Sequence, residues 1–382
     1  MIDPSRNEPL ITILIPTRER LATLRFTLRT ALDQATDRIE VLVADNASTD
    51  GTHDFVASIR DPRLRYVTSG SRVSMSDNWE NALRHARGRY LMIIGDDDAV
   101  MPGAIDRLIQ DLNKNPYEVL LWPKHVYVWP GPKSDAYVER IATPSTPRRI
   151  DLGRLAGQVL VQGGWGHYSL PSIYHSLVHR RIPDEIRRRH GRVYHTTQPD
   201  IFMEICVPAF ANDAFDVGYS VTAHGRSAMS NGWIATRNEQ PVQIERFIAE
   251  YGEYRIHPTL YPGIPMMANL TPDSLLVARD LFASHYSSSP FGYEAMWAFI
   301  CREARVFKWR ITPIDVARRR SEISAFHKLN LVRFSAYLAW HAASAMRSAL
   351  TRRKETHIAG PDIGTFVRTL VERDAMRPST VS

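Results

Sequence analysis

The sequence has little cysteine: Cys206 and Cys301 are the two among 382 residues. Two cysteines exclude a disulfide framework and a cysteine-based zinc site, and they suit a reducing cytoplasm. The sequence also lacks a run of about 20 apolar residues, which a membrane-spanning helix would need. Residues 1–10 lack the basic segment and apolar stretch of a secretory signal. We therefore expect a cytoplasmic protein that is soluble or peripherally bound to a membrane.

Charged residues make up 23% of the chain and hydrophobic residues 44%, which is the composition of an ordinary globular protein. The net charge of +7 comes from one end of the chain. Residues 301–382 hold 16 Lys/Arg and 7 Asp/Glu, whereas residues 1–300 hold 32 and 34. No zinc-finger or RNP-type motif accompanies the basic segment, so we expect no nucleic-acid binding.

Four short apolar runs alternate with helical patterns over about the first 110 residues. The runs are Leu10–Pro16, Ile39–Ala44, Leu64–Val67 and Tyr90–Ile94. Runs of this length suit strands that are buried on both faces of a sheet. Their alternation with helices predicts βαβ units, a parallel sheet and an α/β fold.

Polar residues follow three of these strands. Thr17 follows the first, Asp45 the second, and the triplet Asp96, Asp97 and Asp98 the fourth. Because the carboxyl ends of parallel strands meet at one edge of a sheet, we expect these side chains to converge. Adjacent carboxylates repel one another unless a cation lies among them, and Mg²⁺ or Mn²⁺ would bring a phosphate with it. A solvated acidic turn is the alternative interpretation.

The second half of the chain is less regular. Glu118–Trp129 predicts one or two strands broken at Pro123, and Phe215–Val221 predicts another strand, followed by a turn at His224–Ser227. Thr196–Phe210 predicts a helix that begins near Pro199. From about residue 235 the pattern is mainly helical.

Four segments, ILIPTRER, VLVADNASTDGT, DNWENALRHARG and YLMIIGDDD, occur in the order and spacing of family 2 glycosyltransferases. Over about 110 residues the chain closely resembles this family, and the resemblance is partial to about residue 232. It implies the glycosyltransferase-A fold, a Rossmann-like, mostly parallel sheet flanked by helices, here with a helical C-terminal extension. It also implies a nucleotide-sugar-binding half at residues 1–130 and an acceptor-binding half at 131–235. The pattern and charge of the remaining chain, where the resemblance is absent, predict a basic helical region at 236–382.

The resemblance implies roles for the residues at the strand ends. The nucleotide base would lie against the loop at Pro16, Thr17 and Arg18 and would donate to Asp45. Its ribose would contact Asp96 and Asp97, and Asp98, with Asp96 as a further ligand, would hold Mn²⁺ or Mg²⁺ at the diphosphate. Arg18 and Glu19 replace the aromatic residue and asparagine that the family often has, which leaves base stacking open.

Three further candidate site residues lie beyond these motifs. Asp200, in the first turn of the predicted helix, is our choice for the catalytic base, with Glu204 one turn later as the fallback. An aspartate that stabilises the helix N-terminus is the alternative for Asp200. His224 is a candidate metal ligand, and a structural or surface histidine is the alternative.

Two aromatic segments suggest contacts with larger partners. Trp165, His167 and Tyr168 lie among glycines and are candidates for an acceptor-binding platform, or else a packed loop. Phe334–Met346 predicts a helix that is too short to span a bilayer. It could lie on an anionic membrane, at the inner face of the cytoplasmic membrane, or pack on the catalytic domain.

Together these features predict an inverting glycosyltransferase that moves a single sugar from a nucleotide-diphosphate donor, most simply a UDP-sugar, to a hydroxyl acceptor. The acceptor would be a glycan or a lipid-linked molecule in bacterial surface polysaccharide or glycolipid assembly. The signature Gln-x-x-Arg-Trp of processive synthases is absent, which favours single-sugar addition. A sugar nucleotidyltransferase and a catalytically inactive nucleotide-sugar-binding protein are the alternatives. The first is disfavoured because no glycine-rich loop follows the first strand.

Overall fold

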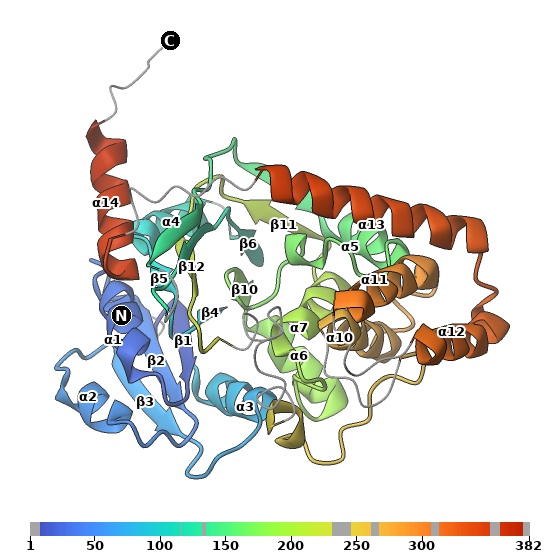
Figure 1. The fold of residues 1–382 in the computed structure, drawn as a ribbon. Helices are drawn as coiled ribbons and strands as arrows, with labels where there is room; N and C mark the ends of the chain where they lie inside the picture. Colours follow the sequence, from blue (N-terminus) through green and yellow to red (C-terminus); the bar gives the residue numbers. More distant parts are fainter. Residues whose placement is uncertain are drawn as a thin grey trace.

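The computed structural model describes residues 8–114, 116–131, 135–230, 246–260, 267–306, 313–351 and 360–376. Strands and their covering helices fill one side of the molecule, and helices from the second half of the chain gather on the other side (Figure 1). The boundary that we predict near residue 235 lies outside the described residues. The predicted division of the chain into residues 1–130, 131–235 and 236–382 therefore remains untested.

An eight-stranded sheet forms the centre of the fold. In spatial order its strands are β3 (Leu64–Thr68), β2 (Ile39–Asp45), β1 (Ile11–Thr17), β4 (Tyr90–Ile93), β10 (Leu177–His179), β6 (Val119–Leu121), β11 (Asp213–Asp216) and β9 (Arg148–Asp151). The four predicted strands β1 to β4 are mutually parallel, and β10 runs antiparallel to both β4 and β6. The predicted α/β fold with a mostly parallel sheet is thus confirmed at its N-terminal half.

The apolar runs form these strands because both faces of the sheet are covered. Along β1, Leu14 faces one hydrophobic core while Ile13 and Ile15 face another. On β4, Ile93 and Met92 divide between the two cores in the same way. Alternate residues of a strand point to opposite faces, so a continuous apolar run serves both cores.

A second, four-stranded sheet lies beside the acidic triplet. Its strands are β5 (Ala99–Val100), β12 (Thr222–Arg226), β7 (His125–Val128) and β8 (Tyr137–Arg140), in that order. The sequence prediction is wrong here, since it places one strand at Phe215–Val221 and a turn at His224–Ser227. Two strands, β11 and β12, flank a turn instead, and His224 lies within β12. The pairing of β12 with β5 brings it to the loop that follows β4.

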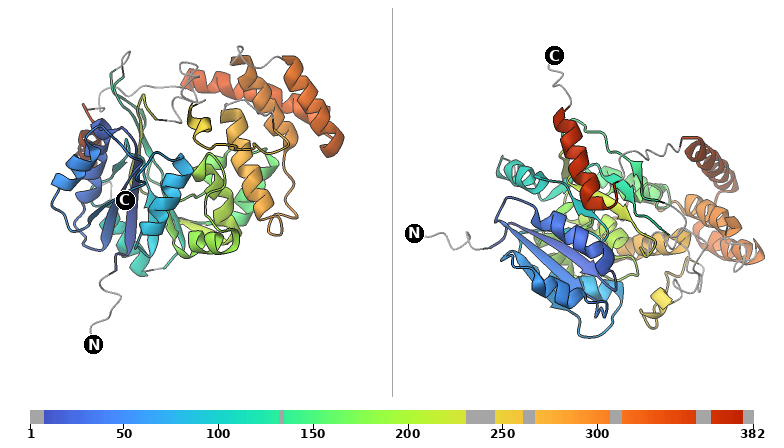
Figure 2. Two further views of the ribbon diagram at one scale, coloured as in Figure 1. Left: turned by 90° about the horizontal axis from the view of Figure 1, so that it is seen from below. Right: turned by 60° about the vertical axis from the view of Figure 1, so that its left-hand side comes forward.

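Helices cover both faces of the central sheet and gather beside it on the side formed by the second half of the chain (Figure 2). They are α1 (Leu21–Leu32), α2 (Thr52–Ser58), α3 (Met75–His85), α4 (Ala104–Lys114), α5 (Leu152–Val161), α6 (Arg181–His190) and α7 (Pro199–Cys206), with short 3₁₀ turns at His167–Ser169 and Val207–Ala209. Helix α3 begins with a side-chain cap from Ser74 and packs on β1 and β2. Helix α7 begins at Pro199, as predicted from the favourable first-turn position of proline.

The C-terminal region is helical, as predicted. Its helices are α10 (Met267–Leu281), α11 (Tyr293–Val306), α12 (Pro313–His327), α13 (Leu331–Thr351) and α14 (Ile363–Met376). Helix α10 packs on α7 and α13 packs on α11, whereas α14 returns to the N-terminal half and packs on α1 (Figure 1). Helix α13 has 21 residues and is longer than the predicted Phe334–Met346. Among the described residues no helix is long and apolar enough to cross a bilayer.

Candidate active site

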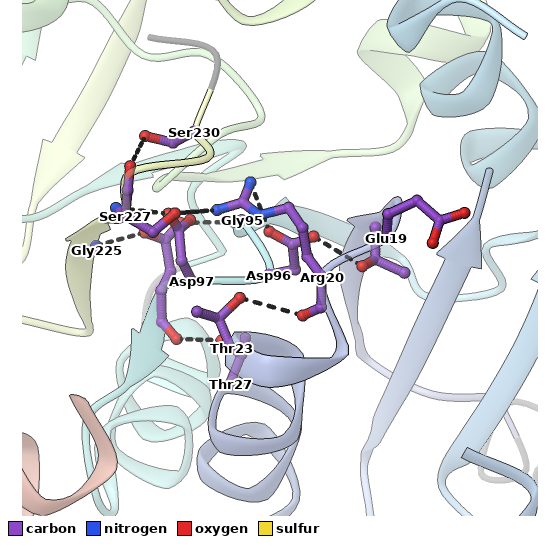
Figure 3. Close-up of polar contacts among 12 residues, drawn as sticks. Glu19, Arg20, Thr23, Thr27, Gly95, Asp96, Asp97, Gly225, Ser227 and Ser230 are labelled. Atoms are coloured by element: carbon purple, nitrogen blue, oxygen red, sulfur yellow. Dashed lines mark hydrogen bonds and ion pairs between the residues drawn. The ribbon is translucent and has the colours of Figure 1, made fainter. Parts of the chain in front are cut away.

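The acidic triplet lies buried at the carboxyl end of β4, and its first two members are held by one arginine (Figure 3). Asp96 accepts hydrogen bonds from Thr17 Oγ1 at 2.7 Å and pairs with Arg20 Nη1 at 2.9 Å. Asp97 pairs with Arg20 Nη2 at 2.6 Å and accepts from the backbone N–H of Ser227 at 3.1 Å. One guanidinium therefore fixes two of the three carboxylates.

Arg20 is a residue that the sequence analysis missed. The signal was a basic residue in the loop after the first strand, opposite the acidic triplet across the same sheet edge. Burial raises the pKa of Asp96 to about 7, although Arg20 and the hydrogen bond from Thr17 oppose that rise. A carboxyl group that titrates near neutrality can accept a hydrogen bond from a ligand hydroxyl when it is ionised, and can donate one to it when it is protonated.

Asp98 is the centre of a separate cluster. Its Oδ2 lies 3.0 Å from His175 Nε2 and accepts from Tyr174 Oη at 2.8 Å and from the Gly95 N–H at 2.5 Å. Its Oδ1 lies 3.3 Å from His224 Nδ1. Burial by itself would raise the pKa of Asp98, but the two histidines outweigh it and hold that pKa well below its usual range.

One ligand atom from each of Asp98, His175 and His224 lies within 4.8 Å of the others. Burial lowers the pKa of His175 to about 4, although Asp98 opposes that shift, so the imidazole is neutral at neutral pH. Neutral imidazole and ionised carboxylate are the forms that bind metals. This donor set fits a divalent transition-metal ion.

The second hydrogen bond of His175 also suits metal binding. Thr222 Oγ1 lies 2.8 Å from His175 Nδ1 and accepts from Trp122 Nε1 at 2.8 Å. The Thr222 hydroxyl can either donate to Nδ1 or accept from it. When it accepts, its two lone pairs take the N–H groups of Trp122 and His175. With the proton on Nδ1, Nε2 of His175 is free to coordinate, which is the usual arrangement of a metal-binding histidine.

Backbone hydrogen bonds between the end of β4 and residues 173–175 place His175 beside Asp98. Ile93 N donates to Ile173 O at 2.8 Å, and His175 N donates to Ile93 O at 3.0 Å. His175 has a φ of 52°, which non-glycine residues seldom adopt and which is frequent at functional sites. The sequence analysis missed His175, and the sequence around it carries no periodic signal.

Strand β12 approaches the acidic loop so closely that one position must be glycine. Gly225 N donates to Asp98 Oδ1 at 2.7 Å. A Cβ atom at Gly225 would lie 1.6 Å from Asp97 O, a backbone atom. The absence of a side chain at Gly225 therefore allows β12 to hold His224 against the cluster.

The residues that we predict for donor binding lie at the same sheet edge. Thr17 and Asp45 are register partners in β1 and β2, and Pro16 lies opposite Ala44. Asp45 accepts from Tyr66 Oη at 2.6 Å and from Ser48 Oγ at 2.5 Å.

Arg18 extends from this edge to the C-terminal half of the chain. Its Nη1 lies 2.8 Å from Glu250 Oε2. Thr17, Asp45 and Asp96–Asp98 are thus brought together, with Arg18 tied to a segment far along the chain.

Asp200 and Glu204 lie on consecutive turns of α7. Burial raises the pKa of Asp200, which is half-buried in the first turn. Burial also raises the pKa of Glu204 to about 7, although His167 opposes that shift through a 2.7 Å contact between Nδ1 and Oε2. A carboxylate with a raised pKa can take up a proton near neutral pH, which a general base must do.

The three residues proposed as an acceptor platform have different surroundings, although the rings of His167 and Tyr168 remain in contact, with centroids 5.8 Å apart. Trp165 packs against Trp340 and His341 of α13, with ring centroids 5.1 Å and 4.8 Å away. His167 contacts Glu204 as described. Tyr168 is 69% exposed and lines a pocket of about 690 Å³ whose wall also includes Tyr174 and His175. The pocket therefore reaches the residues that surround Asp98.

Comparisons with known proteins bear on the family and the fold. Residues 12–154 match the family model "Glycosyl transferase family 2". The structure also resembles S. aureus TarS 1–349 in complex with UDP-GlcNAc, at a TM-score of 0.53 and 12% identity over 96% of this chain and 91% of that one. This likeness confirms the predicted glycosyltransferase-A type of fold.

Two glucosyltransferases are among the curated relatives that match part of this chain. One is a GalNAc(5)-diNAcBac-PP-undecaprenol beta-1,3-glucosyltransferase of Campylobacter jejuni, 27% identical over 28% of this chain and 35% of that protein. The other is the Escherichia coli UDP-Glc:alpha-D-GlcNAc-diphosphoundecaprenol beta-1,3-glucosyltransferase WfaP, 30% identical over 23% of this chain and 36% of that protein. The chain thus spans about a third of the length of these relatives, which are glycosyltransferases of bacterial glycan assembly.

Proposed function

We propose that this protein is a glycosyltransferase that moves one sugar from a nucleotide-diphosphate-sugar to a hydroxyl group of a bacterial surface glycan or its lipid-linked precursor. One observation carries the proposal: a carboxylate and two imidazoles gather within 4.8 Å beside the buried carboxylates of a glycosyl transferase family 2 domain. That pairing suits a donor whose leaving group is a metal-bound diphosphate.

The donor is most simply a UDP-sugar, because the structurally similar TarS binds UDP-GlcNAc and WfaP is named for UDP-Glc. Asp45 would accept from an N–H of the base, next to the loop at Pro16, Thr17 and Arg18. Asp96 and Asp97 would accept from the ribose hydroxyls, with Arg20 keeping both carboxylates oriented. Carboxylates suit this role because each can accept from two hydroxyls.

Asp98, His175 and His224 would hold a divalent ion, which when bound acts as a Lewis acid on the departing diphosphate. Two imidazoles and one carboxylate favour Mn²⁺ over Mg²⁺, since imidazole ligands suit transition metals and Mg²⁺ prefers oxygen. Tyr174 Oη and the N–H groups of Gly95 and Gly225 orient the Asp98 carboxylate and leave its position fixed before the donor arrives.

Asp200 would act as the general base. It takes the proton from the acceptor hydroxyl while that oxygen bonds to the anomeric carbon and the bond from this carbon to the diphosphate oxygen breaks. The nucleoside diphosphate leaves with the bonding electrons, and a single displacement inverts the configuration. Glu204 is already paired with His167, so we assign it to positioning of the acceptor side and keep it as the alternative base.

The test of this function is a donor panel with Mn²⁺ or Mg²⁺. We expect release of nucleoside diphosphate from one UDP-sugar, faster with Mn²⁺, because the ligands include two imidazoles. A chelator should abolish the release, and added Mn²⁺ should restore it. Release that is unchanged by chelator would refute the metal assignment.

The same panel distinguishes the two alternative functions. A sugar nucleotidyltransferase would consume nucleoside triphosphate and release pyrophosphate instead of nucleoside diphosphate. A catalytically inactive binding protein would bind the donor with Mn²⁺ and release nothing in the presence of any acceptor.

We also propose that α13 contacts the anionic inner face of the cytoplasmic membrane, where lipid-linked acceptors reside. Leu331, Val332 and Trp340 are 66%, 79% and 42% exposed on this helix, and Arg333 is exposed among them. Exposed apolar and cationic side chains together suit an interfacial helix.

Binding to sedimented liposomes should require acidic lipids and should weaken as salt screens the charges. The double variant Leu331→Ser/Val332→Ser should lose most of it, whereas exposed Val161→Ser on α5 should not. Equal binding to neutral liposomes would refute this contact.

A further inference from the structure

The pocket of about 690 Å³ extends away from the metal-binding cluster and carries a basic lining. Tyr174 and His175 form the wall that it shares with the cluster. Lys124, between β6 and β7, lines it as well. Arg149 on β9 and Arg154 on α5 lie along its lining too. None of the residues that we assign to the donor lines this pocket.

The basic lining is only partly neutralised. Asp216 lies 3.7 Å from Arg148, and Arg149 pairs with Asp213. Asp151 serves as the N-cap of α5, where its Oδ1 accepts from the Arg154 N–H at 2.8 Å.

Two cations of the lining have no such partner. Among the described residues, the side chains of Lys124 and Arg154 have no carboxylate oxygen within 4.0 Å. Within the described part of the chain neither side chain is therefore ion-paired, although the charges of Glu204, Asp98 and Asp200 act on Lys124 from farther away.

Lys124 is the more informative of the two, because it is half-buried whereas Arg154 is exposed. Burial lowers the pKa of its ammonium group, although the nearby carboxylates of Glu204 and Asp98 oppose that shift. A desolvated ammonium without a hydrogen-bonded partner is unfavourable, and an incoming anion relieves that cost. Lys124 lines the pocket together with His175 of the cluster, and charges on both the cluster and α7 act on its ammonium group, so an anion bound there would lie near the proposed reaction centre.

We propose that this pocket binds a phosphate or diphosphate group of the acceptor through Lys124 and Arg154, so that the acceptor is a phosphorylated molecule. Guanidinium groups favour phosphate because they donate two parallel hydrogen bonds to its oxygens. The volume is in the range that accommodates a small ligand. The proposal rests on the proposed sugar transfer and adds a substrate class to it.

Calorimetry measures the binding of decyl diphosphate to the full chain. The chain is first saturated with UDP and Mn²⁺, so that the donor side is occupied. The variants Lys124→Met and Arg154→Gln should each weaken binding by roughly 10- to 100-fold, the loss of a charge-assisted hydrogen bond. Arg188→Gln, which removes an exposed arginine of α6 outside the pocket, should bind as the parent protein does.

Decyl maltoside and decanoate are the comparison ligands. Weak binding of both supports recognition of phosphate, whereas decanoate binding as tightly as decyl diphosphate would overturn it in favour of a carboxylate. Inorganic pyrophosphate distinguishes the source: equal affinity indicates that the phosphate alone is recognised, and tighter decyl diphosphate indicates a lipid-borne group.

The two proposals fail separately in this design. UDP that binds with Mn²⁺ while decyl diphosphate binds equally to parent and variants would overturn the acceptor subsite and leave the donor site intact. UDP that fails to bind would instead overturn the donor assignment. Arg154 is exposed, so Arg154→Gln should keep the fold and provide an answer even if Lys124→Met unfolds.

Discussion

Replacing Asp98 with asparagine is expected to reduce turnover on the order of 10³-fold, since a bound metal stabilises the departing charge by several kcal/mol. Asp98 is fully buried and supplies the carboxylate of the cluster, and asparagine keeps its size while removing the negative charge. Mn²⁺ affinity, measured by calorimetry, should fall together with Mn²⁺-dependent UDP affinity. Release of nucleoside diphosphate reports the loss of turnover.

Two further variants separate loss of metal from loss of structure. His175→Gln should also weaken Mn²⁺ binding, because it removes one imidazole of the cluster. Asp54→Asn, on an exposed helix of the same domain, should change neither Mn²⁺ affinity nor turnover. An Asp98→Asn protein that released nucleoside diphosphate at the parent rate, with the parent response to chelator, would refute the metal site.

The substitution Asp200→Asn is expected to have the second large effect on turnover. Turnover should fall by about 10²- to 10⁴-fold, the contribution of a positioned general base, while UDP and Mn²⁺ affinities stay within about twofold. The affinities should stay because Asp200 lies on α7, apart from the ligands that we assign to donor and metal. Equal loss of donor affinity and turnover would show that Asp200 acts in binding.

The pH dependence of kcat distinguishes Asp200 from Glu204. A base must be ionised, so activity is lost as pH falls through the pKa of the base in the complex. Burial raises the pKa of both carboxyls, to about 7 for Glu204. A limb near pH 7 that disappears in Glu204→Gln would assign the base to Glu204. A limb that persists in that variant excludes Glu204 as its source, and its loss from the residual activity of Asp200→Asn would then assign it to Asp200 and not to Asp96, whose pKa burial also raises to about 7.

The N-terminal half of the fold was predictable because its strands are covered on both faces. Each of β1, β2 and β4 is a mostly apolar run, interrupted by Thr12 in β1 and by Glu40 in β2, and this signal does not depend on distant residues. β10 has three residues and takes its place between β4 and β6 by antiparallel pairing, which no local pattern announces. The strand predicted at Phe215–Val221 failed because two short strands flank a turn there.

Within the site, the convergence of Thr17, Asp45 and the acidic triplet followed from one geometric rule about parallel strands. Arg20 and His175 escaped because their roles depend on tertiary pairing. Arg20 must cross from β1 to the end of β4, and His175 depends on two backbone hydrogen bonds to Ile93. The sequence shows that a histidine is present at position 175, but its place beside Asp98 depends on how its segment pairs with the sheet.

The return of α14 to the N-terminal half has a consequence for biosynthesis. Phe366 stacks on Tyr127, with ring centroids 5.4 Å apart, and joins the same apolar cluster as Leu28. Contacts of such high sequence separation form late, since the intervening chain must be ordered first. Until the ribosome has synthesised α14, this apolar surface beside the sheet is exposed to water. The nascent chain is therefore a natural client for chaperones until α14 has been made.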